Sequence, residues 1–346
     1  MTKDINDGKM KCIVITTIQP PTPCVLKFVE EAGSDWKIVV VGDKKTPAHW
    51  ELPNVVYLGE NEQRTYFGAL ADELPWNNYA RKNLGYLYAI KRGALLLYET
   101  DDDNYPLDGW RDATTLSSTS PTDIVTGPHV VNILKHFTPT PIWPRGLPLD
   151  LITDTSPLTI TPNQGSNNIA VMQWLANGNP DVDAIYRLTH AEIDVVFSVR
   201  PPVELDSGVF TPCNSQNTLW SPKAFPLMYL PSFVDMRLTD ILRGYIAQKC
   251  LWAIGARLGY GTATVAQNRN QHDLMKDFAG ECTTYLSSNK ILATLSGLDI
   301  KGINASDAMV QCYKSLYKIG VVSYEETVLL DKWLSIVSLA SNSSKP

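Results

Sequence analysis

The sequence predicts an α/β protein with a doubly wound, mostly parallel sheet of the Rossmann type. Over the first hundred residues, short apolar runs alternate with amphipathic stretches, the pattern of parallel strands flanked by helices. The 346 residues are enough to bury a large core, and 44% of them are hydrophobic. We therefore expect ligands to bind beyond the carboxyl ends of the strands, as in other open sheets of this class.

The elements are assigned in chain order from apolar spacing and from the turn residues that bound each run. The pattern predicts strands over residues 12–17, 37–41, 55–58, 94–98, 124–126, 209–219 and 263–265. It predicts helices over residues 23–32, 78–91, 167–175, 239–254, 306–317 and 324–340. We expect a loose N-terminus over residues 1–10, a main domain over 11–285 and a helical C-terminal appendage over 286–346.

Composition excludes several classes of protein. The net charge of −6 gives no broad positive field for nucleic acid or anionic membrane. The apolar run Cys12–Ile18 is too short for a signal peptide core or a membrane span, so we expect a cytoplasmic protein. Six scattered cysteines without a C-x-x-C pair indicate reduced thiols. The sequence leaves open whether the chain forms a homo-oligomer.

An acidic cluster follows the predicted strand at Ala94–Tyr98. The strand runs into Glu99 and then into three successive aspartates, Asp101, Asp102 and Asp103. Like charges at this density repel, and Mg²⁺ or Mn²⁺ would relieve the repulsion by taking carboxylate and phosphate oxygens. An acidic surface turn is the alternative. We favour a divalent cation site, because the acids end a core strand in an α/β setting.

Anion recognition must rely on side chains or a cation. No G-x-G-x-x-G follows the first strand and no P-loop motif occurs, which excludes both common glycine-rich phosphate cradles. Arg81 and Lys82 open the predicted helix 78–91, where amide donors and cations suit an anion, although a solvated basic pair is the alternative. Thr16, Thr17 and Asp43 fall at the ends of the first strands, at the same predicted edge as the acids.

Seven stretches, in order over about residues 11–282, resemble the STELLO-type glycosyltransferases, which have the GT-A fold. They are Thr16–Ile18, Asn78–Tyr86, Glu99–Asn104, Trp143–Gly146, Asn177–Thr189, Pro212–Leu219 and Asp240–Tyr245. A more distant resemblance is to the reversibly glycosylated polypeptides, which act as UDP-arabinopyranose mutases. They share three aspartates after a strand and an Arg-Gly before a proline-bearing segment. Plant STELLO proteins carry an N-terminal membrane anchor that this sequence does not show, so their Golgi location is not carried over.

The resemblance implies a GT-A-like nucleotide-sugar-binding catalytic domain over residues 11–285. It implies metal-dependent transfer of a sugar, a hexose or a pentose, from a UDP-linked donor to an acceptor hydroxyl, with inversion. The acceptor would be a glycan, a protein or a modified nucleobase. One alternative is a UDP-sugar mutase, which needs no acceptor. The other is a non-catalytic partner of a polysaccharide synthase.

The resemblance also implies residues for the metal and the donor. Asp103 and Asp101 would hold Mn²⁺ or Mg²⁺ as a Lewis acid for the diphosphate. His272, in a polar run after the last strand, is a candidate further ligand, and a structural histidine is the alternative. Uracil would lie at the ends of the first strands. The donor residues would be Thr16, Thr17, Asp43, Arg81, Lys82, Asp101, Asp102, Asn217 and Arg269.

Further candidates serve the reaction and the acceptor. Asp240, near a helix start, would be the general base with Arg243 as its salt partner, and helix-dipole compensation is the alternative. Arg145 would carry the sugar in a mutase. Amide and carboxylate side chains suit sugar hydroxyls, while capping and core packing are the alternatives for the aspartates and for tryptophan. The sugar- or acceptor-binding candidates are Trp143, Asp181, Asp183, Asn214 and Gln216.

Overall fold

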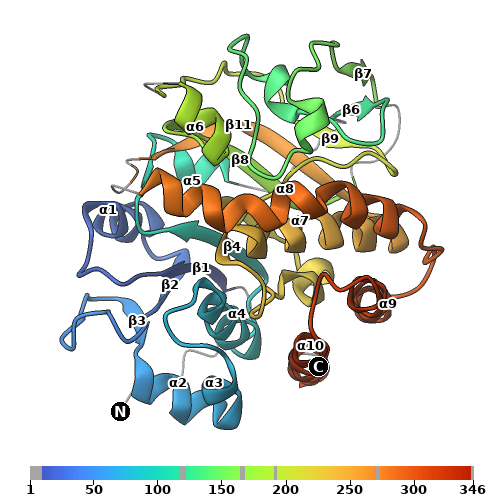
Figure 1. Ribbon diagram of the computed structural model, residues 1–346. Helices are drawn as coiled ribbons and strands as arrows, with labels where there is room; N and C mark the ends of the chain where they lie inside the picture. The colour runs from blue at the N-terminus through green and yellow to red at the C-terminus, as the bar shows by residue number, and fades with distance from the viewer. Residues whose placement is uncertain are drawn as a thin grey trace.

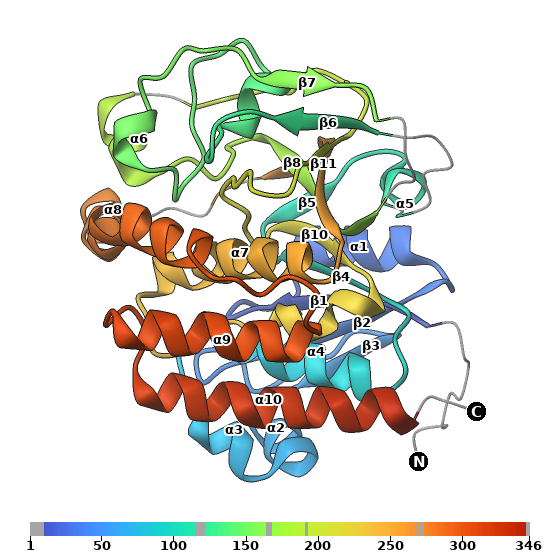
Figure 2. The same ribbon diagram turned by 90° about the vertical axis from the view of Figure 1, so that its right-hand side faces the viewer.

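The computed structural model describes residues 10–114, 116, 122–163, 168–190, 193–267, 269 and 273–343. These residues build an α/β structure around an 11-stranded sheet in the order β3-β2-β1-β4-β10-β8-β11-β9-β6-β7, with β5 paired to β11 (Figure 1). Figure 2 shows the C-terminal helices stacked one below another beside the strands. The predicted fold class, a mostly parallel α/β sheet with C-terminal helices, is confirmed.

The strands form two parallel groups joined by one antiparallel strand. Parallel ladders join β3, β2, β1 and β4, and another joins β8 to β11. Strand β10 pairs antiparallel with both β4 and β8. The bounds are β1 Lys11–Thr16, β2 Trp36–Val41, β3 Val55–Leu58, β4 Leu96–Asp101, β5 Asn104–Pro106, β6 Asp123–Thr126, β7 Thr159–Thr161, β8 Ile169–Gly178, β9 Val203–Leu205, β10 Asn217–Trp220 and β11 Arg257–Gln267.

Helices cover both faces of the sheet. Along β1, Cys12 and Val14 pack with α4 and α7 on one face, while Ile13 and Ile15 pack with α1 and α5 on the other. This alternation is the period of two expected of a strand. The helices are α1 Pro23–Ala32, α2 Glu60–Phe67, α3 Ala69–Glu73, α4 Lys82–Lys91, α5 Trp110–Ala113, α6 Ala184–Thr189, α7 Met236–Ala253, α8 Leu274–Ser296, α9 Ala305–Lys318 and α10 Tyr324–Ser343, with short 3₁₀ helices η1 Tyr79–Arg81, η2 Ile133–His136, η3 Leu149–Leu151 and η4 Pro222–Met228.

Strand direction brings distant parts of the chain to one edge of the sheet. Strands β1, β2, β4, β8 and β11 point the same way, so their carboxyl ends lie at this edge, where the antiparallel β10 begins. The described residues at this edge are 16–18, 42–43, 101–103, 178–181, 214–217, 267 and 269.

The predicted helix at 167–175 is wrong, because the described part of this stretch, from residue 168 on, runs into β8. Residues 170–176 are buried at every position, as in a strand covered on both faces. Apolar spacing alone does not separate such a strand from a buried helix. Helix α8 was not predicted, and it runs through the predicted boundary at 285/286. The domain boundaries stay a prediction.

Helix α7 is the central helix of the described structure. Of its 18 residues, 15 are buried, between the sheet and helices α8 and α9. Gly244 permits this packing, because a Cβ atom there would lie 2.2 Å from the carbonyl oxygen of Cys213. Among the described residues no helix is both long and apolar enough to cross a bilayer.

A buried ion pair ties α7 to β4. Arg243 donates to both carboxylate oxygens of Glu99, at 2.9 and 2.7 Å, and both side chains are almost fully buried. Glu99 also accepts hydrogen bonds from the Tyr86 hydroxyl and from the Trp220 indole, the latter at 2.8 Å. The predicted pairing of Arg243 with Asp240 is therefore wrong. Glu99 points into the core and is separate from the aspartates that follow it.

We predict that Glu99→Gln, which keeps the side chain's shape but removes its charge, lowers the free energy of unfolding by about 3–5 kcal/mol, because it leaves the Arg243 charge buried without a counterion. Urea unfolding followed by tryptophan fluorescence measures this change. The control is Lys27→Ala, which removes the exposed ion pairs of Lys27 with Glu30 and Glu31 on α1. Equal midpoints for the two variants would contradict a structural role for the buried pair.

Candidate active site

A cleft of about 480 Å³ lies at the carboxyl edge of the sheet. Its walls come from both parallel groups of strands, from the loops that follow them and from the start of α7. Predicted site residues that line it are Thr16, Thr17, Asp43, Arg81, Asp101, Asp102, Asp103, Arg145, Asp181, Asn214, Gln216, Asp240 and Arg269. Residues that were not predicted include Lys45, Tyr79, Met236, Arg237 and Gln267.

Asp101 already has a cationic partner within the protein. The Lys82 ammonium group lies 3.0 Å from Asp101 Oδ1, and the Lys82 side chain is 0% exposed. Lys82 also donates to the carbonyl oxygen of Thr100 at 2.7 Å, and the Tyr79 hydroxyl donates to Asp101 Oδ1 at 3.0 Å. Lys82 thus supports Asp101 from below the cleft and does not line it.

Asp103 lacks such a partner. Its Oδ2 accepts a 3.2 Å hydrogen bond from Gln267, but its buried Oδ1 has no hydrogen-bond partner among the described residues. Burial and the charges of Asp101 and Asp102 raise the pKa of Asp103 to about 7. Burial also raises the pKa of Asp102, which accepts a hydrogen bond from the Thr17 hydroxyl. Among the described residues, therefore, no cation pairs with the Asp103 carboxylate in the cleft.

This carboxylate fits a divalent cation shared with a ligand. Within the described ranges, no group of three His, Cys, Asp or Glu side chains is arranged to hold a metal. Mg²⁺ at phosphate sites, however, is usually bound by one or two carboxylates together with substrate phosphates. Asp103 Oδ1 and Asp101 Oδ2, the oxygen of Asp101 that is not bonded to Lys82 or Tyr79, match this donor set. His272 lies outside the described residues, so its role as a ligand stays a prediction.

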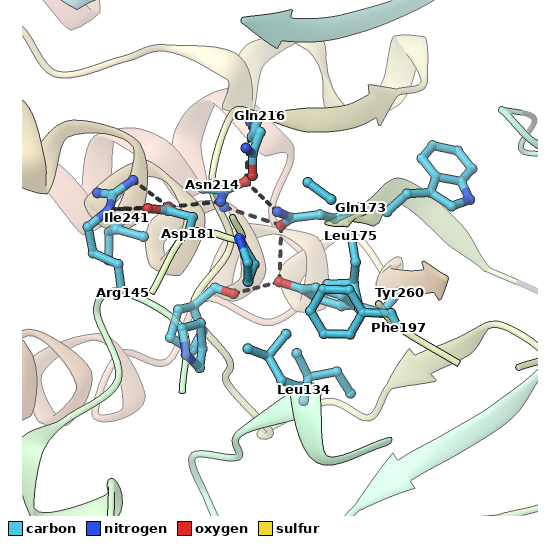
Figure 3. Close-up of a pocket in the computed structure, with 16 residues that line it drawn as sticks. Leu134, Arg145, Gln173, Leu175, Asp181, Phe197, Asn214, Gln216, Ile241 and Tyr260 are labelled. Atoms are coloured by element: carbon cyan, nitrogen blue, oxygen red, sulfur yellow. Dashed lines mark hydrogen bonds and ion pairs between the residues drawn. The ribbon is translucent and has the colours of Figure 1, made fainter. Parts of the chain in front are cut away.

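Elsewhere in the cleft, Arg145 bridges two carboxylates, those of Asp181 and Asp240, and Figure 3 shows its pairing with Asp181. It donates to Asp181 from Nε and one terminal nitrogen, at 2.9 and 2.7 Å, and to both oxygens of Asp240 at 2.9 Å. Its remaining N–H bonds the carbonyl oxygen of Arg237 at 2.5 Å, so every N–H of the guanidinium has an acceptor. Burial alone would raise the pKa of Asp181, but the charge and hydrogen bonds of Arg145 hold it well below its usual value.

Two arginines form a basic wall beside this bridge. Arg237 donates to Glu281 at 3.0 Å, and Arg269 donates to Asp277 at 2.5 Å, both acceptors being on α8. Burial and the charge of Arg237 lower the pKa of Arg269. Arg237 was not predicted, although its spacing of three residues from Asp240 places both on one face of a helix. The lining of the cleft thus includes Arg237 and Arg269 in addition to Arg145.

The family follows from comparison with known proteins. Residues 237–340 match the model of the STELLO glycosyltransferases. Over 71–74% of its length the chain is similar to proteins named as probable STELLO glycosyltransferases. It is 30% identical over 266 residues to the Arabidopsis thaliana "Probable glycosyltransferase STELLO1", covering 71% of this chain and 34% of that protein. It is also 30% identical over 276 residues to "Probable glycosyltransferase STELLO2" from the same plant, covering 74% and 35%.

The predicted resemblance is therefore confirmed. The chain spans about a third of the length of the curated relatives it matches. The STELLO match begins at Arg237 and includes Asp240, the basic wall and most of α10.

Two predicted donor residues have structural partners at the wall of the cleft. The Asp43 carboxylate accepts hydrogen bonds from the backbone amides of Asn77, at 2.8 Å, and Asn78, at 3.0 Å. Arg81 is buried and donates to the Gln63 side chain and, at 2.9 Å, to a backbone carbonyl. Both residues hold the loop before α4, and their contact with a donor stays a prediction.

Three other predicted residues lie away from the lining of the cleft. Asn217 is buried within the sheet, where it donates to the Leu175 carbonyl at 2.9 Å. Trp143 donates to Asp183 at 2.8 Å, and Asp183 caps α6 by accepting from the amide of Tyr186 at 2.7 Å. Burial raises the pKa of Asp183 to about 6. The contacts of Asp183 and Trp143 therefore match the capping and packing roles that were given as alternatives for these two residues.

Helix α10 holds the segment that leads into α7. The buried carboxylate of Glu326 accepts from the amides of Ser232, at 2.9 Å, and Phe233, at 2.7 Å, and from the hydroxyl of Tyr229. Asn83 on α4 bonds both backbone groups of Leu230 at 2.8 Å. Helix α10, most of which lies in the region that matches the STELLO model, therefore helps to position α7, the helix that carries Asp240.

We predict that Glu326→Ala removes the protection of the Ser232 and Phe233 amides from hydrogen exchange and lowers the free energy of unfolding by about 1–3 kcal/mol, because buried donors lose their acceptor. Peptide-level hydrogen–deuterium exchange over residues 228–238 reports the local change. Glu325→Ala, at the exposed neighbouring position, is the control and keeps the parent's protection. Equal exchange in both variants would contradict this role for Glu326.

Proposed function

We propose that this chain transfers a sugar from a UDP-linked donor to an acceptor hydroxyl, with Mn²⁺ or Mg²⁺ as cofactor and with inversion at the anomeric carbon. The proposal rests on two features of one cleft. The Asp103 carboxylate has no cationic partner among the described residues, and Asp240 is paired with Arg145 in the same cleft. The match to the STELLO glycosyltransferase model and the relatives named as probable glycosyltransferases support glycosyl transfer as the class of reaction.

Donor binding would use the acidic edge and the basic wall together. Asp103, with Asp101 Oδ2, would hold the cation, which when bound supplies a Lewis acid for the diphosphate leaving group. The guanidinium groups of Arg237 and Arg269 are suited to donate to phosphate oxygens. Uracil would lie where β1 and β2 end, beside Asp43, whose carboxylate is held in place by backbone amides.

Asp240 would act as general base. Its carboxylate is held by Arg145 and by a 3.0 Å hydrogen bond from the Ile241 amide. As the acceptor oxygen bonds to the anomeric carbon, its proton would pass to Asp240. The bond from that carbon to the diphosphate would break, and UDP would leave with the electron pair.

The contacts of Arg145 weigh against the mutase alternative. An arginine that carries a sugar must first lose a proton from the nitrogen that attacks. Each N–H of Arg145 has an acceptor, and the neighbouring charges of Asp181 and Asp240 hold the pKa of Arg145 well above its usual value. A non-catalytic partner of a polysaccharide synthase, the other alternative, predicts no UDP binding and is tested by the first experiment below.

We predict that Asp103→Asn weakens the binding of UDP in the presence of Mn²⁺ about tenfold or more, because the variant loses a charged cation ligand. Isothermal titration calorimetry with UDP, with and without MnCl₂, measures the effect. The exposed Asp108→Asn is the matched control and should bind like the parent chain. UDP binding that does not depend on Mn²⁺, or that Asp103→Asn leaves unchanged, would refute the assignment.

We predict that Asp240→Asn lowers kcat for UDP release from a UDP-sugar by about 10²- to 10⁴-fold, the usual contribution of a general base. The dissociation constant for UDP should stay close to that of the parent chain, because Asp240 would act on the acceptor. A coupled assay for UDP, run over a panel of UDP-sugars with MnCl₂, gives kcat. An unchanged kcat with unchanged UDP affinity would show that another group accepts the proton.

A further inference from the structure

A small side chamber adjoins the cleft (Figure 3). Its volume of about 30 Å³ has room for about two water molecules. The chamber shares four lining residues with the cleft: Arg145, Asp181, Asn214 and Gln216. These residues form a polar boundary between the two adjacent spaces, close to Asp240, which Arg145 contacts.

The two sides of the chamber differ in chemistry. Amides and carboxylates line the side that it shares with the cleft, while Leu134, Leu175 and Phe197 contribute an apolar surface farther in. Figure 3 shows Leu134 and Phe197 on the side opposite to Asn214 and Gln216. A substituent with one carbon and one hydroxyl group matches both sides. An anionic group is disfavoured, because the carboxylates of Asp181 and Asp240 outnumber the Arg145 guanidinium.

The polar side retains hydrogen-bonding capacity for a hydroxyl group. Gln216 uses one N–H to bond Asn104 at 3.1 Å, and Asn214 uses one N–H to bond Asp181 at 2.9 Å. Each side-chain amide carries two N–H groups, and with the described residues each uses only one of them. Gln173, deeper in the chamber, is held by the Tyr260 hydroxyl at 3.0 Å and by Asn214. The site is therefore rigid.

Size separates the ligands that fit. A whole sugar ring is too large for a space of about two water molecules, but a hydroxymethyl group has two non-hydrogen atoms. A pentopyranose has no such group, and a uronic acid replaces it with a carboxylate. The ring of a donor sugar would lie between the diphosphate and Asp240, and from there its exocyclic substituent would be directed toward the chamber.

We propose that the chamber receives the exocyclic hydroxymethyl group of the donor sugar, so that the donor is a neutral UDP-hexose. This inference rests on the proposed function. Gln216 and Asn214 bond the hydroxyl group, and Leu134 contacts the methylene carbon. A UDP-pentose leaves the chamber hydrated, and a UDP-uronate places a carboxylate beside Asp181.

The test uses two pairs of donors that differ only by the hydroxymethyl group. They are UDP-glucose with UDP-xylose, and UDP-galactose with UDP-β-L-arabinopyranose. Dissociation constants are measured by calorimetry in MnCl₂, with UDP as reference. We expect the hexose of at least one pair to bind about tenfold or more tightly than its pentose, the usual scale for one small group in a fitted pocket. Equal affinities within both pairs would overturn the inference.

Two variants test the chamber itself. Leu134→Phe fills it and should reduce the preference for the hexose to less than about twofold, while the affinity for UDP stays that of the parent chain. Gln216→Leu removes the polar contact without filling the space, and it covers the case in which Leu134→Phe fails to fold. Leu134→Met is the volume-matched control. A preference that survives both Leu134→Phe and Gln216→Leu would contradict the inference.

Binding of UDP and preference for a hexose are measured separately. If UDP itself does not bind in MnCl₂, the proposed function fails and the inference falls with it. If UDP binds and the paired donors bind equally, the proposed function stands and only the hexose assignment is wrong.

Discussion

The bridge that Arg145 makes between Asp181 and Asp240 joins three distant segments of the chain: the loop at 143–146, the segment after β8 and the start of α7. Without the guanidinium, two carboxylates would face each other in a partly buried site. The repulsion and the cost of desolvation would push the segments apart or force one acid to take up a proton. The bridge thus builds one wall of the cleft, and its guanidinium holds the pKa of Asp181 well below the usual value.

In another wall of the cleft, Lys82 pairs with Asp101, while Asp103 has no cationic partner among the described residues. Lys82 supports Asp101 from within the core, so three consecutive aspartates do not carry three equivalent charges. Asp102 is held by Thr17, while Asp103 keeps a buried oxygen without a partner among the described residues. Protein groups offset the charge of Asp101 and leave that of Asp103. Asp103 is therefore the strongest candidate for a cation that arrives with its ligand.

Part of this site could be predicted from the sequence, since strand ends converge wherever the strands are parallel. That rule correctly places Thr16, Asp101 and Asp103 in one cleft. The directions of side chains could not be predicted in the same way. Glu99 comes just before the three aspartates in the sequence, but its side chain points into the core. Lys82 was expected to contact the donor, but its side chain lies below the cleft. The stretch that became β8 was misassigned, because a fully buried strand has no alternation to distinguish it.

The central claim is that a divalent cation binds at Asp103 and joins it to a diphosphate. A crystal grown with MnCl₂ and UDP, with an anomalous difference map at the manganese edge, tests this most directly. We expect a manganese peak in contact with both the Asp103 carboxylate and the phosphates of UDP, with Arg145 still bridging Asp181 and Asp240. A map with UDP in the cleft but no manganese at Asp103, or with manganese bound elsewhere, would contradict the account.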